Sequence, residues 1–235
     1  MRNLRHAAAT WICAAAILAG AAAASAQMRG PGMMGGGAGA MRGIFSPVVG
    51  EGAEYQMTSA NDPNPTTMGI AVVGKEDVNG VTGYWIEITT ADRRSGGTMY
   101  MKMLTVVSAG NTQTTKMIMQ QPGQQPMEMD MSMMQGMQSR RPPQSADISK
   151  QAQDMGSETI TVPAGTFTCE HYRSADGDDV WVSSKVSPWG LVKMTGARAN
   201  MTLDKVITDA KDMITGTPVQ MQMPNMGGMG GPPQQ

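Results

Sequence analysis

The chain is poor in cysteine, histidine and aromatic residues, and these shortages exclude several classes of protein. Its 235 residues include two cysteines and two histidines, and aromatic residues make up 4%. A disulfide framework needs more cysteines than this. The sequence also lacks the Gly-x-Ser-x-Gly, His-Glu-x-x-His and phosphate-loop patterns. Its net charge of −1 offers no basic footprint for nucleic acid. We therefore expect a non-enzymatic protein that does not bind nucleic acid.

The first 26 residues have the three features of a secretory signal peptide. Arg2 and Arg5 make the start positive, and residues 7–24 are apolar and rich in alanine. The Ala-Ser-Ala sequence that ends at residue 26 is a small-x-small cleavage pattern. A membrane anchor is the alternative, but alanine is weakly hydrophobic and the run is close to the shortest that spans a bilayer. We expect cleavage before Gln27, a mature chain in the periplasm or outside the cell, and no membrane span in that chain.

Composition divides the rest of the chain into one domain and two arms. Residues 27–43 and 217–235 are rich in Gly, Met and Pro and have no periodic apolar face, so we expect both to be disordered. Residues 44–216 have the length of a single domain. Inside it, residues 121–155 lack a regular pattern and contain a run rich in methionine, which predicts an irregular insertion.

Apolar and polar residues alternate through most of this domain, as they do in half-buried β-strands. Asn79-Gly80 is a strong hairpin signal, because both residues tolerate positive φ. After the insertion, short segments rich in Val, Thr and aromatic residues are separated by Gly, Pro and Asp turns as far as residue 208. These patterns predict a mostly β fold with almost no helix, which is a single curved antiparallel sheet or open half-barrel of about nine or ten strands.

Methionine is the most abundant large apolar residue, with 26 copies against two phenylalanines. Met99, Met101 and Met103 alternate along a predicted strand and therefore share one face. Methionine is unbranched and polarisable and re-packs around varied shapes. These three residues and Trp85 are candidate contacts for an apolar small molecule or a cell-envelope protein on the curved sheet. The alternative is that they fill the core.

Methionine also suggests a metal site, because thioether sulfur is a soft ligand that prefers Cu(I) and needs no deprotonation. No other cofactor is indicated. The alternatives are that the methionines accumulated by drift in low-complexity sequence, or that the protein is a purely structural component of the envelope. The candidate metal ligands are the six methionines between residues 127 and 137: Met127, Met129, Met131, Met133, Met134 and Met137.

Phe167, Cys169 and His171 also share one face of a predicted strand. A thiol and an imidazole can both bind a soft or borderline metal, but two ligands do not complete a site. Phe167 marks the face as a packed one, and an unpaired cysteine is usually buried. We expect Cys169 to be a packing residue.

The second half of the domain resembles a signature of exported bacterial domains of unknown function. The matching elements are the sequence VPAGTF over residues 162–167 followed by Cys169, the sequence DVWVS over residues 179–183, and the sequence VSPWGLVK over residues 186–193. These domains are similar to the lipoprotein-carrier superfamily, in which a curved antiparallel sheet wraps an apolar cavity. The resemblance implies a fold and not an activity.

Overall fold

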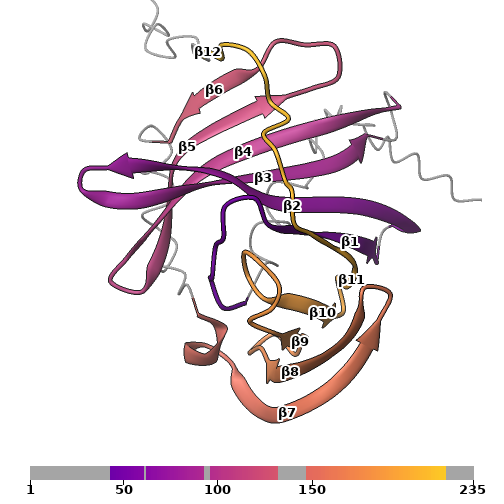
Figure 1. The fold of residues 1–235 in the computed structure, drawn as a ribbon. Coiled ribbons are helices and arrows are strands. Elements are labelled where there is room, and N and C mark those ends of the chain that lie inside the picture. The colour runs from indigo at the N-terminus through magenta and orange to yellow at the C-terminus, as the bar shows by residue number, and fades with distance from the viewer. Residues whose placement is uncertain (1–42, 61, 93–95, 132–146, 221–235) are drawn as a thin grey trace, which may run out of the picture.

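The computed structural model describes residues 43–60, 62–92, 96–131 and 147–220, which form twelve strands and one short 3-10 turn (Figure 1). The predicted signal peptide and most of both predicted arms lie outside these residues. The turn is η1 (Ile148–Lys150). The strands are β1 (Gly52–Ser59), β2 (Asp62–Val78), β3 (Val81–Asp92), β4 (Gly97–Ser108), β5 (Asn111–Gln120), β6 (Met127–Asp130), β7 (Gln153–Val162), β8 (Gly165–Arg173), β9 (Asp179–Val182), β10 (Leu191–Thr195), β11 (Ala199–Ile207) and β12 (Val219–Gln220).

All twelve strands belong to one open sheet with the order β12-β6-β5-β4-β3-β2-β1-β11-β10-β9-β8-β7. Neighbouring strands are antiparallel, apart from the parallel pair of β6 and β12. Two meanders, β1 to β6 and β7 to β11, are joined where β1 pairs with β11. The prediction of a mostly β, curved antiparallel sheet is confirmed, with twelve strands in place of nine or ten.

Two tight turns set the register of the first meander. Asn79 and Gly80 have φ angles of 54° and 82° and join β2 to β3, at the hairpin that the sequence predicts. Ala109 and Gly110 have φ angles of 50° and 77° and join β4 to β5. Left-handed residues of this kind match the twist of the flanking strands, so each turn pairs the last residue of one strand with the first residue of the next.

The main core lies on the inner face of the sheet, where the two meanders meet. It runs without a break from the inner sides of β1 to β4 to those of β8 to β11. The Tyr55 hydroxyl donates to the Leu191 carbonyl over 3.0 Å and ties β1 to β10 inside this core. The Ala164 N–H donates to the Leu203 carbonyl over 3.4 Å, which holds the β7–β8 hairpin where it curves back toward β11 (Figure 1).

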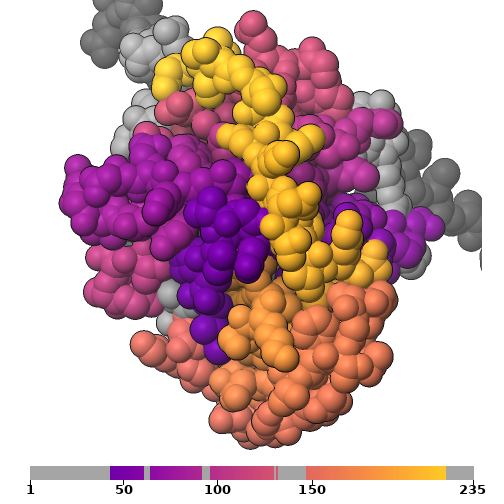
Figure 2. Space-filling view, in the orientation of Figure 1, coloured from indigo at the N-terminus to yellow at the C-terminus, as the bar shows by residue number. Residues whose placement is uncertain are grey.

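A C-terminal strap, residues 208–218, crosses the outer face of the first meander (Figures 1 and 2, yellow). Its Ala210 N–H donates to the Gly50 carbonyl over 2.8 Å, near the start of β1. Beyond the strap, the Val219 N–H donates to the Pro126 carbonyl over 3.0 Å, just before β6. The Ile214 side chain of the strap is buried against the outer face, which also buries Leu104 and Ile118. The outer face therefore has a small apolar layer of its own.

The described parts of the predicted insertion, residues 121–131 and 147–155, are more regular than their composition predicts. Met127–Asp130 forms β6 and pairs with β5, Ile148–Lys150 forms η1, and β7 begins at Gln153. The predicted tail also contributes β12, which pairs with β6. Both corrections have the same cause, because pairing with a neighbouring strand orders segments that have no strong local preference. Across the described ranges, we find no helix with the length and apolar character needed to cross a bilayer.

Candidate functional site

Cross-strand pairing gathers six methionines on the inner face of β4, β5 and β6. Residues directly opposite each other in an antiparallel pair share a face, and the inner face is the one on which Met103 joins the main core. We call this surface the inner methionine face. Its first row is Met101, Met119 and Met127, and its second row is Met103, Met117 and Met129.

A one-residue bulge in β5 creates this alignment. The tight turn between β4 and β5, continued without irregularity, would place Ile118 opposite Met101. Thr115 is instead an extra residue in β5, and its hydroxyl donates to the Leu104 carbonyl over 3.3 Å. A bulge shifts the pairing by one residue, so Met119 stands opposite Met101. The methionines of the two strands therefore face the same way.

Both rows continue the core as uncharged lines of side chains. On β3, Ile86 stands opposite Met103 and Ile88 stands opposite Met101. Met103 is 7% exposed and belongs to the core, and Met101 and Met117 pack against it. The other three methionines of the face are half-buried. The inner methionine face is thus an apolar margin of the core that is still open in part to solvent.

Two of the four candidate ligand contacts lie outside the two rows: Met99 shares the inner face of β4 with Met101 and Met103, as the alternation predicts, whereas Trp85 does not share it. Met99 is half-buried near the start of β4 and stands opposite Thr90, without a methionine beside it in the register. Trp85 stands opposite Leu104, so it lies on the outer face. Ile86, the next residue of β3, stands opposite Met103 on the inner face, and neighbouring residues of a strand point to opposite faces. The interpretation that Trp85 lines one surface with Met101 and Met103 is therefore wrong.

Trp85 has a structural environment on the outer face. Its indole N–H donates to Glu76 over 3.1 Å, and the Lys102 ammonium lies 5.2 Å from its ring centroid. Lys116 pairs with Glu76 over 2.7 Å, and this hydrogen bond lowers the pKa of Glu76. These contacts tie β2, β3, β4 and β5 together.

The structure divides the six candidate metal ligands. Met127 and Met129 lie in the rows, and Met131 is buried directly after β6. Met133, Met134 and Met137 lie outside the described residues. Sequence reasoning missed Met117 and Met119, although their alternation in the sequence KMIMQ is visible. Met101 and Met103 are candidate contacts for an apolar ligand, and Met127 and Met129 are candidate metal ligands. The structure places all four on one surface.

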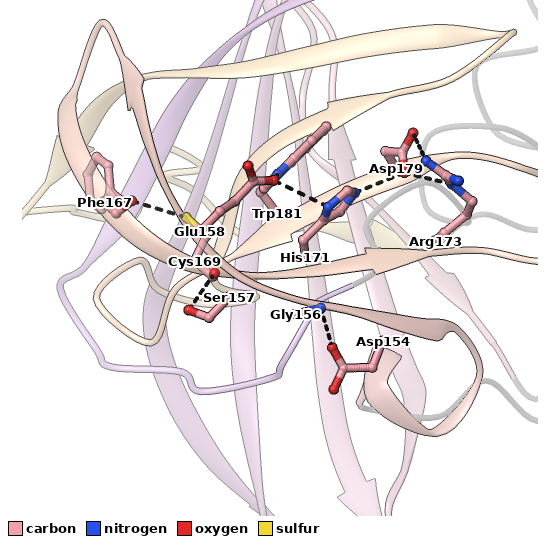
Figure 3. Close-up of polar contacts among 10 residues, drawn as sticks. All are labelled: Asp154, Gly156, Ser157, Glu158, Phe167, Cys169, His171, Arg173, Asp179 and Trp181. Atoms are coloured by element: carbon pink, nitrogen blue, oxygen red, sulfur yellow. Dashed lines mark hydrogen bonds and ion pairs between the residues drawn. The ribbon is translucent and has the colours of Figure 1, made fainter.

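Cys169 and His171 do not form a joint metal site (Figure 3). Cys169 is 1% exposed, and burial, assisted by the negative charge of Glu158, raises its pKa to about 11. His171 Nδ1 lies 3.2 Å from Glu158 and Nε2 lies 2.9 Å from Asp179, and the ring stacks on Trp181 at a centroid distance of 4.4 Å. His171 thus links β7 to β9 and makes no contact that requires the thiol.

Asp179 completes this cluster through Arg173, whose Nε donates to it over 2.9 Å. The hydrogen bond from Arg173 holds the pKa of Asp179 below its ordinary value, and His171 adds to the effect. Within the described part of the chain, no group of three or more His, Cys, Asp or Glu side chains is placed to hold a metal ion. We interpret the cluster as a set of cross-strand contacts.

Two shallow cavities lie away from the inner methionine face. One, of about 290 Å³, lies between the end of β1 and the β10–β11 turn, where Ser59 and Arg198 are among its lining residues. The other, of about 180 Å³, lies beneath the strap beside Glu87 and Met213. No methionine of the two rows lines either of them.

No protein-family model matches this chain, and no curated protein matches it. Among solved structures, the chain is similar to a protein assigned as exported, with a YmcC-like fold, from Bacteroides fragilis, at 13% identity and a TM-score of 0.38. It is also similar to a protein assigned as a lipoprotein from Parabacteroides distasonis, at 16% identity and a TM-score of 0.34. Each comparison covers 70% of this chain and 99% of the other. Likenesses of this size carry no argument about function, so the resemblance to the lipoprotein-carrier superfamily stays a prediction.

Proposed function

We propose that the protein is an exported, non-enzymatic binding domain whose inner methionine face takes up a flexible apolar ligand. The observation that carries this proposal is the continuity of the two rows, which extend the core as an uncharged and half-open surface. Unbranched thioether side chains adapt to ligands of different shape. An acyl chain or a similar flexible apolar molecule is the ligand that such a surface suits.

The size of the face matters for this proposal. Micromolar affinity corresponds to about 8 kcal/mol, and each 100 Å² of buried apolar surface contributes roughly 2.5 kcal/mol. A ligand must therefore cover more than about 300 Å², even before the cost of losing its freedom is included. One half-buried methionine cannot supply that area. The two rows offer five half-buried methionines side by side to one ligand.

Export and the lack of catalysis rest on the sequence. The predicted signal peptide implies a mature chain outside the cytoplasm, and an apolar molecule in water is stabilised by an apolar binding surface. After that segment, His171 is the one histidine that is left, and it is held between two carboxylates. A cell-envelope protein is an alternative occupant of the same face, and the test below separates it from a small molecule.

The test is native mass spectrometry of the protein purified from its own envelope, followed by titration with a fluorescent fatty-acid analogue. We expect a co-purifying apolar small molecule and saturable binding of the probe. The double variant M119Q/M127Q keeps the side-chain length but makes the first row polar, so we expect affinity to fall by at least about tenfold. The matched double variant M119L/M127L keeps the row apolar and should bind within about twofold of wild type.

Two outcomes would contradict this proposal. One is that the glutamine and leucine variants bind the probe equally well, with unchanged melting temperatures. The other is that a protein partner, and no small molecule, is retained by the wild-type face and lost from the glutamine variant. If neither a ligand nor a partner is found, the purely structural interpretation is favoured.

A further inference from the structure

Three thioethers stand side by side in the second row, on three neighbouring strands. Met117 on β5 lies between Met103 on β4 and Met129 on β6. Side chains directly opposite each other in a sheet have Cβ atoms about 4.5–5.5 Å apart. Two rotatable bonds place the sulfur of each methionine and a third turns its methyl group, so three sulfurs at this spacing can converge on one ion without a change in the strands.

We propose that the second row, Met103, Met117 and Met129, is a binding site for a single Cu(I) ion. This inference is independent of the apolar ligand, because it requires the sulfur atoms and not the apolar surface. It also differs from a site in a flexible methionine-rich segment. Two of its ligands lie in β4 and β5, outside the methionine run at residues 127–137, and the sheet holds all three in register.

The chemistry of the ligands selects the ion. Thioethers are soft and neutral, and soft sulfur ligands select Cu(I) among the biological metals. Three neutral ligands leave the charge of the ion uncompensated, and the cost of burying an uncompensated charge is high. A soft monovalent ion is therefore favoured over Zn²⁺ or Cu²⁺. No acidic side chain occurs in the row that would change this preference.

Packing makes the second row a better site than the first. Met103 is buried in the core and Met117 packs against it, whereas in the first row only Met101 packs against the core. Side chains that packing already holds lose less rotamer entropy when they bind an ion. Met129 on β6 is half-buried and gives the ion access from solvent.

The experiment is an anaerobic titration of the mature full-length chain with Cu(I), in competition with a colorimetric Cu(I) chelator. The test variant is M117L, which removes the central sulfur and keeps a similar volume. The matched control is M119L, the same substitution two residues away on the same strand. We expect the affinity of the tightest site to fall at least tenfold in M117L and to stay within twofold of wild type in M119L.

A second measurement locates the ion among the many methionines of the chain. In protein labelled with ¹³C at the methionine methyl groups, one equivalent of Cu(I) should shift the signals of Met103, Met117 and Met129. The signals of Met194 and Met201, which are buried elsewhere in the core, should not move. Because a thioether carries no proton, the affinity should also be the same at pH 6 and pH 8.

The proposal is overturned if the second-row signals do not shift, or if M117L and M119L lose the same affinity. Either result would mean that copper, if it binds, is held by other methionines. Failure here is distinguishable from failure of the proposed function, because the copper titration responds to the sulfur atoms of the second row, whereas the fatty-acid titration of M119Q/M127Q responds to the apolar character of the first row. Conversely, if the wild-type protein binds Cu(I) at the second row but does not bind the fatty-acid analogue, the proposed function alone is rejected.

Discussion

At the scale of single residues, Glu87 is an ionisable group buried on the outer face of the sheet. Its side chain is 2% exposed on the outer face of β3, and its carboxylate accepts the N–H groups of Met213 over 3.1 Å and of Ile214 over 3.4 Å. Burial raises its pKa from 4.5 to about 7, and the nearby Asp212 adds to the increase, while the hydrogen bond from Met213 opposes it. Asp212 is itself paired with Lys102 on β4. Glu87 therefore fastens the strap at the cost of burying a charge.

This raised pKa predicts a particular dependence of stability on pH. Between about pH 4.5 and 7, the folded chain holds a proton on Glu87 that the unfolded chain has released. The contribution of Glu87 to the free energy of unfolding is therefore full below pH 4.5 and is lost as the pH rises through about 7. The variant E87Q cannot titrate, and its amide oxygen can still accept from the strap.

We expect E87Q to flatten the fall in stability between pH 5 and pH 7 and to be at least as stable as wild type at pH 8. Urea unfolding at four pH values across this range measures the effect. If the two proteins keep the same slope, Glu87 is not the group that titrates.

At the scale of elements, the strap is held by its backbone, by the ion pair of Asp212 with Lys102 and by the buried side chain of Ile214. Ile214 is 5% exposed on the outer face, whereas its neighbour Met213 is 52% exposed.

Replacing Ile214 with alanine leaves a cavity and should lower the free energy of unfolding by about 2–4 kcal/mol. Replacing Met213 with alanine keeps the N–H that Glu87 accepts, so the change should stay within about 0.5 kcal/mol. Chemical denaturation of both variants at one pH compares them directly, and equal losses would show that the burial of Ile214 is not what holds the strap.

The elements that could be predicted are those with strong local signals. Asn79-Gly80 predicts its hairpin because positive φ is a property of the two residues themselves. β6 and β12 have four and two residues, and their sequences show little that distinguishes them from the low-complexity segments around them. They are ordered by neighbours that are distant in the chain, as when Val219 pairs with Met127. Local composition does not contain this information.

The candidate site illustrates the same limit more sharply. Alternation alone predicts that Met101 and Met103 share a face, and the structure agrees. It does not predict that Met117 and Met119 stand opposite them, because that depends on the single extra residue Thr115 in β5. A one-residue change of register moves every following side chain to the other face. The composition of the site was therefore visible in the sequence, while its assembly was not.

At the scale of the whole molecule, both proposals require a chain that folds outside the cytoplasm without its first 26 residues. An apolar segment retained at the N-terminus would tether the sheet to the membrane and compete for the apolar face. The cleavage pattern is defined by small residues at Ala24 and Ala26, whereas the residue between them is less restricted. This asymmetry provides a matched pair of variants.

We expect the secreted protein to begin at Gln27 when the full-length chain is expressed with its own leader in a bacterial host. Phenylalanine in place of Ala26 should block cleavage and leave the chain in the membrane fraction, because the peptidase accepts only a small side chain there. Phenylalanine in place of Ser25 should leave processing nearly unchanged. N-terminal sequencing and the intact mass of each fraction distinguish these forms. A secreted wild-type chain that still contains Trp11 would reject the assigned leader, and the location of the binding domain would have to be established again.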